Sequence, residues 1–126
     1  MSTVPTMKDS LAPGVEASAS YTVTDDMSPP HLPMKVLSTP SMIMLMEQTC
    51  LQSVLDHLDD GESTVGTHVC VSHAAAAASG ESVTITSKLA EVTKRRLTFE
   101  VKATAGEKLL GEGTHQRAVI DTRRFA

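Results

Sequence analysis

The stretch Thr39–Cys50, TPSMIMLMEQTC, predicts the beginning of a long helix against which the other segments of the chain pack. Thr39 followed by Pro40 is typical of a helix start, because the hydroxyl accepts a free backbone N–H and the proline ring suits the first helical position. The apolar residues that follow predict a helix running to about Asp60, where Gly61 would end it. This helix is the element around which we place the remaining segments.

One carboxylate, Glu47, lies inside this apolar stretch. At about 100° per residue, its neighbours on the helix surface are Ile43, Met44, Cys50 and Leu51. The preceding turn, residues 42–46, is apolar on every side and is expected to be covered all round. We therefore expect a desolvated Glu47. It is either a structural acid tied to a buried basic partner, or a group facing a cavity and prepared for acid, base or nucleophile chemistry.

The other segments predict strands packed around this helix. Residues 1–15 are rich in Pro, Ser and Thr and predict a flexible N-terminal arm, and residues 16–126 predict a single domain. Residues 25–40 hold four prolines, which excludes regular structure from most of that segment. Strands are predicted near residues 16–24, 64–78, 82–93, 95–104 and 108–120. One long helix followed by an antiparallel meander is an α+β arrangement.

Composition excludes several classes of protein. Hydrophobic residues make up 40% of the 126 residues and aromatic residues only 2%, so aliphatic side chains and Met must build the core. No run approaches the roughly 20 apolar residues of a membrane span. The first ten residues also lack the basic and apolar regions of a secretory signal. With a net charge of -4, we expect a cytoplasmic protein that has no membrane or nucleic-acid partner.

Cysteine spacing and charge distribution add two further expectations. Cys50 and Cys70 have the spacing of neither a metal site nor a disulfide framework, so no metal is expected. Residues 88–126 hold nine of the eleven Lys and Arg residues. This basic excess fits either solvated strand faces or an anchor for an anionic ligand such as a nucleotide phosphate.

Several polar or small residues other than Glu47 are candidates for a functional site. Thr39, near the positive end of the helix dipole, would stabilise a developing oxyanion as well as cap the helix. His73 points to the apolar side of its strand, where a histidine is more often a hydrogen-bonded core residue than a catalyst, and both interpretations stay open. His68 and His115 have weaker claims. Gly66 would let the backbone and a ligand approach closely.

Three motifs occur in a defined order along the chain: VLSTPSMIMLMEQTC (36–50), VGTHVCVSHAA (65–75) and GEGTHQRAVI (111–120). Together they resemble the fluoroacetyl-CoA thioesterase family of small hotdog-fold hydrolases, from about residue 15 to the C-terminus. The resemblance implies a hotdog fold, in which a curved antiparallel β-sheet wraps a long central helix. It also implies a homodimer with two sites at the subunit interface.

The same resemblance implies roles for individual residues. Thr39, Glu47 and His73 correspond to the catalytic threonine, glutamate and histidine of the family. Gly66 corresponds to its substrate-contacting glycine and Arg117 to the arginine of its last strand. The substrate would be an acyl-CoA, so coenzyme A enters as part of the substrate and no separate cofactor is implied.

The chain departs from the family pattern around the acyl group. Family members selective for fluoroacetyl groups place aromatic residues before the helix and a tryptophan directly after the glutamate. Here the corresponding segment is HLPM (31–34), and Gln48 follows the glutamate. Met34 and Met42 are predicted to supply a deformable acyl pocket. We therefore expect a thioesterase for short- or medium-chain acyl groups, without strict fluoroacetyl selectivity.

Two other functions remain as alternatives. The stretch DMSPPH, from Asp26 to His31, is similar to the Asp-x-Asn-Pro-x-His signature of hotdog enoyl-CoA hydratases, with Ser28 in place of the asparagine. Such an enzyme would add water across a double bond with Asp26 and His31 and would leave Glu47 without a role. A non-catalytic acyl-CoA-binding protein is the second alternative.

Overall fold

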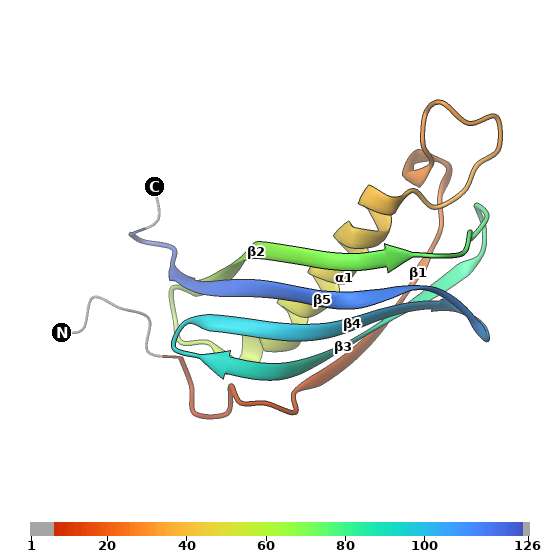
Figure 1. Ribbon diagram of the computed structural model, residues 1–126. Helices are drawn as coiled ribbons and strands as arrows, with labels where there is room; N and C mark the ends of the chain where they lie inside the picture. The colour runs from red at the N-terminus through yellow and green to blue at the C-terminus, as the bar shows by residue number, and fades with distance from the viewer. Residues whose placement is uncertain (1–6, 125–126) are drawn as a thin grey trace.

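The computed structural model describes residues 7–124. A curved five-stranded antiparallel sheet, in the order β1-β3-β4-β5-β2, carries one long helix across one of its faces (Figure 1). The elements in chain order are β1 (Glu16–Thr22), η1 (Asp25–Met27), α1 (Thr39–Val54), η2 (Leu55–His57), β2 (Glu62–His73), β3 (Ser82–Thr93), β4 (Arg96–Ala105) and β5 (Lys108–Asp121). The predicted α+β hotdog architecture is confirmed.

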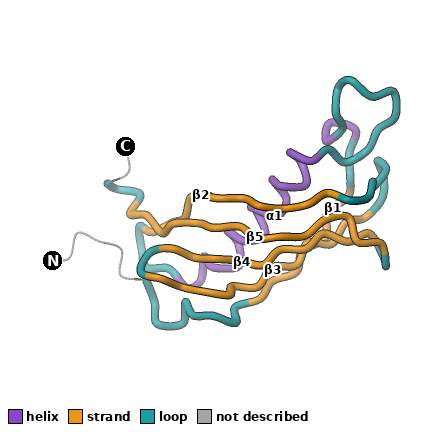
Figure 2. The backbone as a smooth tube through the Cα atoms, in the orientation of Figure 1, coloured by secondary structure: helices purple, strands orange, loops and turns teal. Residues whose placement is uncertain are grey.

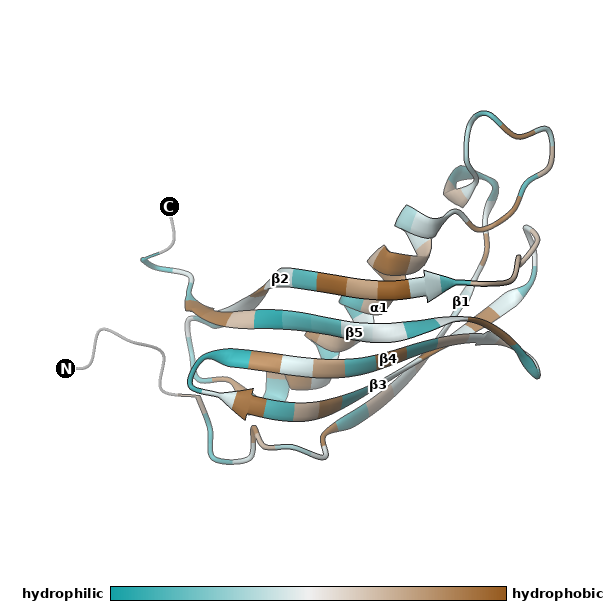
Figure 3. Ribbon diagram, viewed as in Figure 1, coloured by the Kyte–Doolittle hydropathy of each residue, from teal (hydrophilic) through white to brown (hydrophobic). Residues whose placement is uncertain are grey.

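The core lies between α1 and the inner face of the sheet. Along β3 and β4, buried and exposed residues alternate with the period of two that a strand requires, visible as alternating brown and teal bands in Figure 3. Phe99 from β4 and Met46 from α1 are among the side chains that are completely or almost completely buried. Burying each such side chain contributes roughly 1.5–3 kcal/mol to stability. The polar outer residues of the same strands face solvent.

Ser38, rather than Thr39, caps the N-terminus of α1. The Ser41 backbone N–H donates to Ser38 Oγ at 3.2 Å, and the first helical hydrogen bond already runs from Met42 N to the Ser38 carbonyl at 2.9 Å. Thr39 and Pro40 therefore occupy the first two helical positions. The prediction of a capping role for Thr39 is wrong, and its hydroxyl is free for another partner.

The helix is shorter than predicted. It ends at Val54 and gives way to the 3-10 turn η2, which returns the chain so that Leu58 is buried against the core. The last turn of α1 contains no basic residue, and Asp56 and two further aspartates follow it. Carboxylates near the negative end of a helix dipole disfavour continuation of the helix to Asp60.

The strand predicted at 64–78 also ends early, at His73. The alanine-rich segment that follows joins the chain just before α1, where the Leu37 N–H donates to the Ala77 carbonyl at 2.8 Å. This contact holds the long loop between β1 and α1, drawn in teal in Figure 2, against the end of β2. As a result, Thr39 lies next to His73.

The described part of the predicted N-terminal arm, residues 7–15, contacts the domain. Leu11 is buried in the core, the Lys8 N–H donates to the His57 carbonyl at 3.1 Å, and the Gly14 N–H donates to the Leu89 carbonyl at 2.8 Å. Residues 1–6 of this arm lie outside the described residues.

The capping assignment yields a direct test. Ser38→Ala should lower the free energy of unfolding by about 1 kcal/mol, because it leaves an N–H of the first turn without a partner. Thr39→Ala should cost less, since that hydroxyl caps nothing. Urea denaturation of the two variants beside the parent protein measures both values. A larger loss for Thr39→Ala than for Ser38→Ala would contradict the assignment.

Candidate active site

One pair of candidate residues meets at the N-terminal end of α1. Thr39 Oγ1 and His73 Nδ1 lie 2.8 Å apart, within hydrogen-bond distance. The pair lines a depression between the proline-rich loop and the end of β2, together with Leu32 and Ala75. His73 Nε2 is buried and has no hydrogen-bond partner among the residues described. Buried groups of this kind are rarely left unpaired in proteins, so this nitrogen is an unsatisfied polar atom beside the depression.

Glu47 lies at the margin of the buried helix face. The residues of α1 that pack against the sheet are Met42, Leu45, Met46, Thr49, Cys50 and Val54. The Glu47 side chain is 39% exposed, and Met44 beside it is 66% exposed. The sheet covers only one side of α1, so the prediction of a fully covered, desolvated Glu47 is wrong for the single chain.

Gly66 of β2 allows the strand to pass against the Glu47 carboxylate. A Cβ atom at this position would lie 2.5 Å from Glu47 Oε1 and 3.2 Å from His115 Cε1, both closer than van der Waals contact permits. The pairing of β2 with β5 shifts register between Gly66 and His68, leaving Thr67 as an extra residue. In a regular strand Gly66 and His73, seven residues apart, would lie on opposite faces. The extra residue of the bulge puts both on the face toward the helix.

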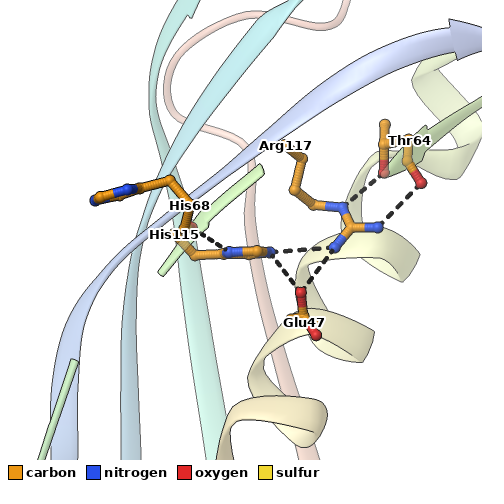
Figure 4. Close-up of polar contacts among 5 residues, drawn as sticks. All are labelled: Glu47, Thr64, His68, His115 and Arg117. Carbon is orange, nitrogen blue, oxygen red and sulfur yellow. Dashed lines mark hydrogen bonds and ion pairs between the residues drawn. The ribbon is translucent and has the colours of Figure 1, made fainter. Parts of the chain in front are cut away.

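Arg117 of β5 provides the positive charge nearest to Glu47. Its Nη1 lies 4.0 Å from Glu47 Oε1, and the residue is 6% exposed (Figure 4). Nε donates to Thr64 Oγ1 at 2.7 Å, and Nη2 donates to the Thr64 carbonyl at 3.0 Å. Burial lowers the pKa of the Arg117 guanidinium, while Glu47 and Cys50 raise it, and an arginine keeps its charge under these conditions. The two bonds to Thr64 leave the Nη1 end turned toward Glu47.

His115 lies behind Arg117, and its protonation state follows from its partners. His115 Nδ1 is 2.8 Å from the His68 carbonyl, and because a carbonyl only accepts, Nδ1 carries the proton. Burial lowers the pKa of His115 most, opposed by the His68 carbonyl and assisted by the Arg117 charge, so the ring is neutral near pH 7. Nε2 is then an acceptor for Arg117 Nη1, at 3.1 Å. The 3.8 Å approach of Nε2 to Glu47 Oε1 is consequently no ion pair.

From the sequence, His115 has a weaker claim to a functional role than His73. The structure shows that the Gly-Thr-His pattern does not distinguish a buried histidine from an exposed one. His115 stands in a Gly-Thr-His triplet like His68, yet His115 is buried whereas His68 is exposed. Only the two-residue spacing to Arg117, which puts both on the same face of β5, carried a signal. That spacing links the two residues without revealing which partners they share.

Cys50, one turn after Glu47, is excluded as a nucleophile at neutral pH. Burial raises the pKa of its thiol to about 12, with the Arg117 charge and Ser87 opposing the shift and Glu47 adding to it. The reactive form of cysteine is the thiolate, which is scarce under these conditions. Within residues 7–124, no group of three or more His, Cys, Asp or Glu side chains is arranged to hold a metal ion. The same residues contain no helix long and apolar enough to cross a membrane.

The candidate residues form two clusters in the single chain. Glu47 follows Thr39 by eight residues, a rise of about 12 Å along the helix. Glu47, Gly66 and Arg117 line a depression of about 400 Å³ that includes neither Thr39 nor His73. The structure therefore brings Thr39 to His73 and Glu47 to Gly66 and Arg117, and it leaves the two groups apart.

The two methionines predicted to bind substrate differ in position. Met34 is 55% exposed in the loop before α1. Met42 is fully buried, with its Sδ and Cε against Gly111 of β5, so it has no surface to offer a ligand. The exposed Met44 lines the depression around Glu47 instead.

A further depression, of about 790 Å³, lies away from both clusters. It is on the outer face of the sheet and is lined by residues of β1, β3, β4 and β5. In the strand register Glu16 stands beside Lys88 and Lys88 beside Glu100, so opposite charges are neighbours. Such a row is what a solvated strand face presents, because cross-strand pairs of opposite charge are favourable.

The residues of the hydratase alternative do not form a pair. Asp26 is exposed in η1 and accepts a hydrogen bond from Thr24 Oγ1. His31 is exposed in the loop that follows. No hydrogen bond or ion pair joins Asp26 to His31 within the described part of the chain, which disfavours the Asp/His mechanism.

Comparison with known proteins agrees with the motifs. The model of a family described as fluoroacetyl-CoA-specific thioesterase matches residues 17–123. A fluoroacetyl-CoA thioesterase from Streptantibioticus cattleyicolor is 35% identical over 128 residues, which cover 94% of this chain and 92% of the relative.

Solved structures give the same result. The fluoroacetyl-CoA thioesterase FlK superposes with a TM-score of 0.87 at 34% identity, covering 93% of each chain. A variant of FlK in complex with fluoroacetate and CoA gives 0.85 at 34% identity, covering 92% of this chain and 100% of the other. A thioesterase superfamily member from Thermus thermophilus, 24% identical with a TM-score of 0.82 over 89% and 85% of the chains, shares the fold. The chain belongs to the family of fluoroacetyl-CoA-specific thioesterases.

Proposed function

We propose that this protein hydrolyses short- or medium-chain acyl-CoA thioesters at a site that two copies of the chain build together. Membership of the family makes the protein a thioester hydrolase. Within the site, Glu47 acts at the reacting carbonyl, and Thr39 and His73 act on the oxyanion and the leaving sulfur. The observation that carries this proposal is a carboxylate at an open depression, beside a buried cation and without a hydrogen bond of its own among the described side chains.

Glu47 has the accessibility that its chemistry needs. Its Oε1 is 4.0 Å from Arg117 Nη1, near enough for charge stabilisation and beyond hydrogen-bond distance. The carboxylate either takes a proton from the water that attacks the thioester carbon, or attacks that carbon itself to form an anhydride that water then opens. Both routes end in a carboxylic acid and the free coenzyme A thiol.

Thr39 and His73 supply the complementary groups. When the His73 ring carries both protons, Nδ1–H donates to the Thr39 hydroxyl, and the buried Nε2 can pass its proton to the departing thiolate, which leaves a neutral ring. Thr39 lies in the first turn of α1, at the positive end of the helix dipole, which favours a developing oxyanion. Glu47 therefore acts in forming the new bond to the thioester carbon, and His73 acts in the departure of the sulfur.

The second copy is needed because β2 is an uncovered edge strand. It is last in the sheet order, its residues 66–70 are all exposed, and Val69 adds an apolar side chain there. Figure 3 shows brown, hydrophobic bands along this strand. Edge strands of this kind pair readily with another strand. Antiparallel pairing of β2 with its own copy brings the Gly66 end of one strand toward the His73 end of the other, which joins the two clusters.

Subunit complementation tests the shared site. Glu47→Gln and His73→Ala should each be nearly inactive as homodimers. When the two variants are unfolded together and refolded, about half of the dimers are mixed, and each mixed dimer regains one complete site of two. Hydrolysis should therefore return to about one quarter of the parent rate, as two-fold symmetry requires.

The matched control for this experiment places both substitutions on one chain. Glu47→Gln refolded with the Glu47→Gln/His73→Ala double variant contains no intact Glu47 and should stay inactive. Sedimentation at micromolar concentration should show a dimer throughout. Failure of the first mixture to recover activity, or a fully active monomer, would contradict a site built by two subunits.

The catalytic role of Glu47 has its own test. Glu47→Gln should lower kcat/KM for acyl-CoA hydrolysis by at least about 100-fold, because a positioned acid–base group supplies that much or more. Stability should change little, since the carboxylate is 39% exposed and Arg117 keeps its bonds to Thr64 and His115. Asp26→Asn is the matched change at an exposed carboxylate and should leave hydrolysis near the parent value. Loss of activity in Asp26→Asn with normal activity in Glu47→Gln would favour the hydratase. A parent protein that hydrolyses no acyl-CoA would favour a pure acyl-CoA binder.

Acyl selectivity follows from the segment before α1. Residues 31–34 contain no Phe, Tyr or Trp, and Leu32 is the member of this segment that lines the depression at Thr39 and His73. Without a dedicated contact to fluorine, kcat/KM for acetyl-CoA and fluoroacetyl-CoA should agree within roughly tenfold. Assays of acetyl-, fluoroacetyl-, butyryl- and hexanoyl-CoA under identical conditions measure this. A preference for fluoroacetyl-CoA above roughly 1,000-fold would show that Leu32 and its neighbours replace the missing rings.

A further inference from the structure

His115 is a buried polar residue that the proposed reaction does not use. Its side chain is 1% exposed, and it is absent from the lining of the depression around Glu47. It nevertheless makes two hydrogen bonds, to the His68 carbonyl and with Arg117 Nη1. A packing residue at this position needs neither bond, and Phe99 at a ring distance of 6.4 Å would accommodate a plain aromatic ring.

The direction of each hydrogen bond is determined. The His68 carbonyl requires a proton on His115 Nδ1, so Nε2 offers a lone pair to the permanently protonated guanidinium. Thr64 accepts from the other edge of the same guanidinium, at Nε and Nη2. Arg117 is thus held on both sides, by β2 and by its own strand.

This double attachment explains the distance between Arg117 and Glu47. Oppositely charged groups this close normally collapse into a direct hydrogen-bonded pair with N to O distances near 2.8 Å. Here Nη1 stays 4.0 Å from Oε1, and no hydrogen bond to the Glu47 carboxylate is formed within residues 7–124. The acceptor on His115 takes one of the two N–H groups of Nη1 and fixes the position of that nitrogen, so that the carboxylate receives the field of the cation from 4.0 Å.

We infer that His115 is a positioning residue of the thioesterase site: as the Nδ1–H tautomer it holds Arg117 Nη1 away from Glu47 and so keeps the carboxylate free to react. This inference rests on the catalytic role proposed for Glu47. His115 makes no hydrogen bond to Glu47, since Nε2 lies 3.8 Å from Oε1, and it acts through Arg117. The charged or titratable groups around Glu47 are Arg117 and His115 from β5 and Cys50 from α1, and the nearby β2 residues Thr64 and Gly66 are uncharged.

Three substitutions distinguish a positioning role of His115 from a packing role. The amide of His115→Gln reaches the place of Nε2 and can still accept from Arg117, whereas the shorter amide of His115→Asn reaches only the place of Nδ1. His115→Phe keeps the ring against Phe99 and removes both bonds. We expect kcat to fall about tenfold or more for Asn and Phe and to stay within about threefold for Gln, with KM little changed in all three.

The control is Gln116→Ala, which alters the next residue of β5 on the opposite face of the strand and should leave kcat unchanged. Thermal unfolding of every variant accompanies the kinetics, and assays are run well below each midpoint. Equal kcat values for Phe and the parent protein, or equal losses for Gln and Asn, would overturn the inference.

A measurement on the unsubstituted protein keeps the test independent of folding. Long-range ¹H–¹⁵N spectra of ¹⁵N-histidine-labelled protein report the tautomer of each imidazole ring, and His115→Gln identifies the signal by its disappearance. We expect a neutral ring protonated at Nδ1 between pH 6.5 and 8. A ring protonated at Nε2, or at both nitrogens, cannot accept from Arg117 and would overturn the inference.

A double-substitution cycle distinguishes failure of this inference from failure of the proposed function. In the Glu47→Gln background, His115→Phe should lower the residual activity no further, because its effect passes through the carboxylate. An additional tenfold loss there would show that His115 acts elsewhere, while the role of Glu47 stands. A Glu47→Gln enzyme with normal turnover would instead remove the proposed function, whatever the His115 variants do.

Discussion

The burial of the Arg117 guanidinium is the constraint on which the site depends. Removing a permanent cation from water is costly, and it is tolerated only when every side of the group meets an acceptor or a negative charge. Thr64 covers one edge, the His115 ring covers the next, and Glu47 supplies the charge at 4.0 Å. Three elements, α1, β2 and β5, therefore have to meet at one point, and Gly66 leaves room for the carboxylate, because a Cβ atom there would lie 2.5 Å from Glu47 Oε1.

The same arrangement explains how Glu47, in the role proposed for it, can lie beside a cation and remain reactive. A hydrogen-bonded ion pair would tie up the carboxylate oxygens and reduce their basicity, whereas a cation held just beyond bonding distance contributes only its field. Arg117 is restrained from both sides, so its position is set by neutral partners rather than by Glu47. Substrate binding would then find the carboxylate already oriented, which is the benefit of a preorganised site.

Family membership and local sequence bear on different parts of the function. The shared fold and membership of the family account for thioester hydrolysis. In the function proposed above, selectivity depends on the segment before α1, which here carries histidine, leucine, proline and methionine at residues 31–34. Small changes in one loop can alter the acyl group accepted while the sheet, the helix and the buried guanidinium keep the chemistry.

Local patterns in the sequence determined the helix that carries Glu47 and the alternating strands β3 and β4, because periodicity acts over a few residues. The tertiary structure alone decided the rest. It assigned the cap to Ser38 and freed Thr39 for His73, and it put Glu47 at the open margin of α1. It also fixed the tautomer of His115 through the carbonyl of His68 on the neighbouring strand. These features depend on strand register and on the side of the helix that the sheet leaves uncovered, which arise between segments far apart in the chain and leave no mark in the spacing of neighbouring residues.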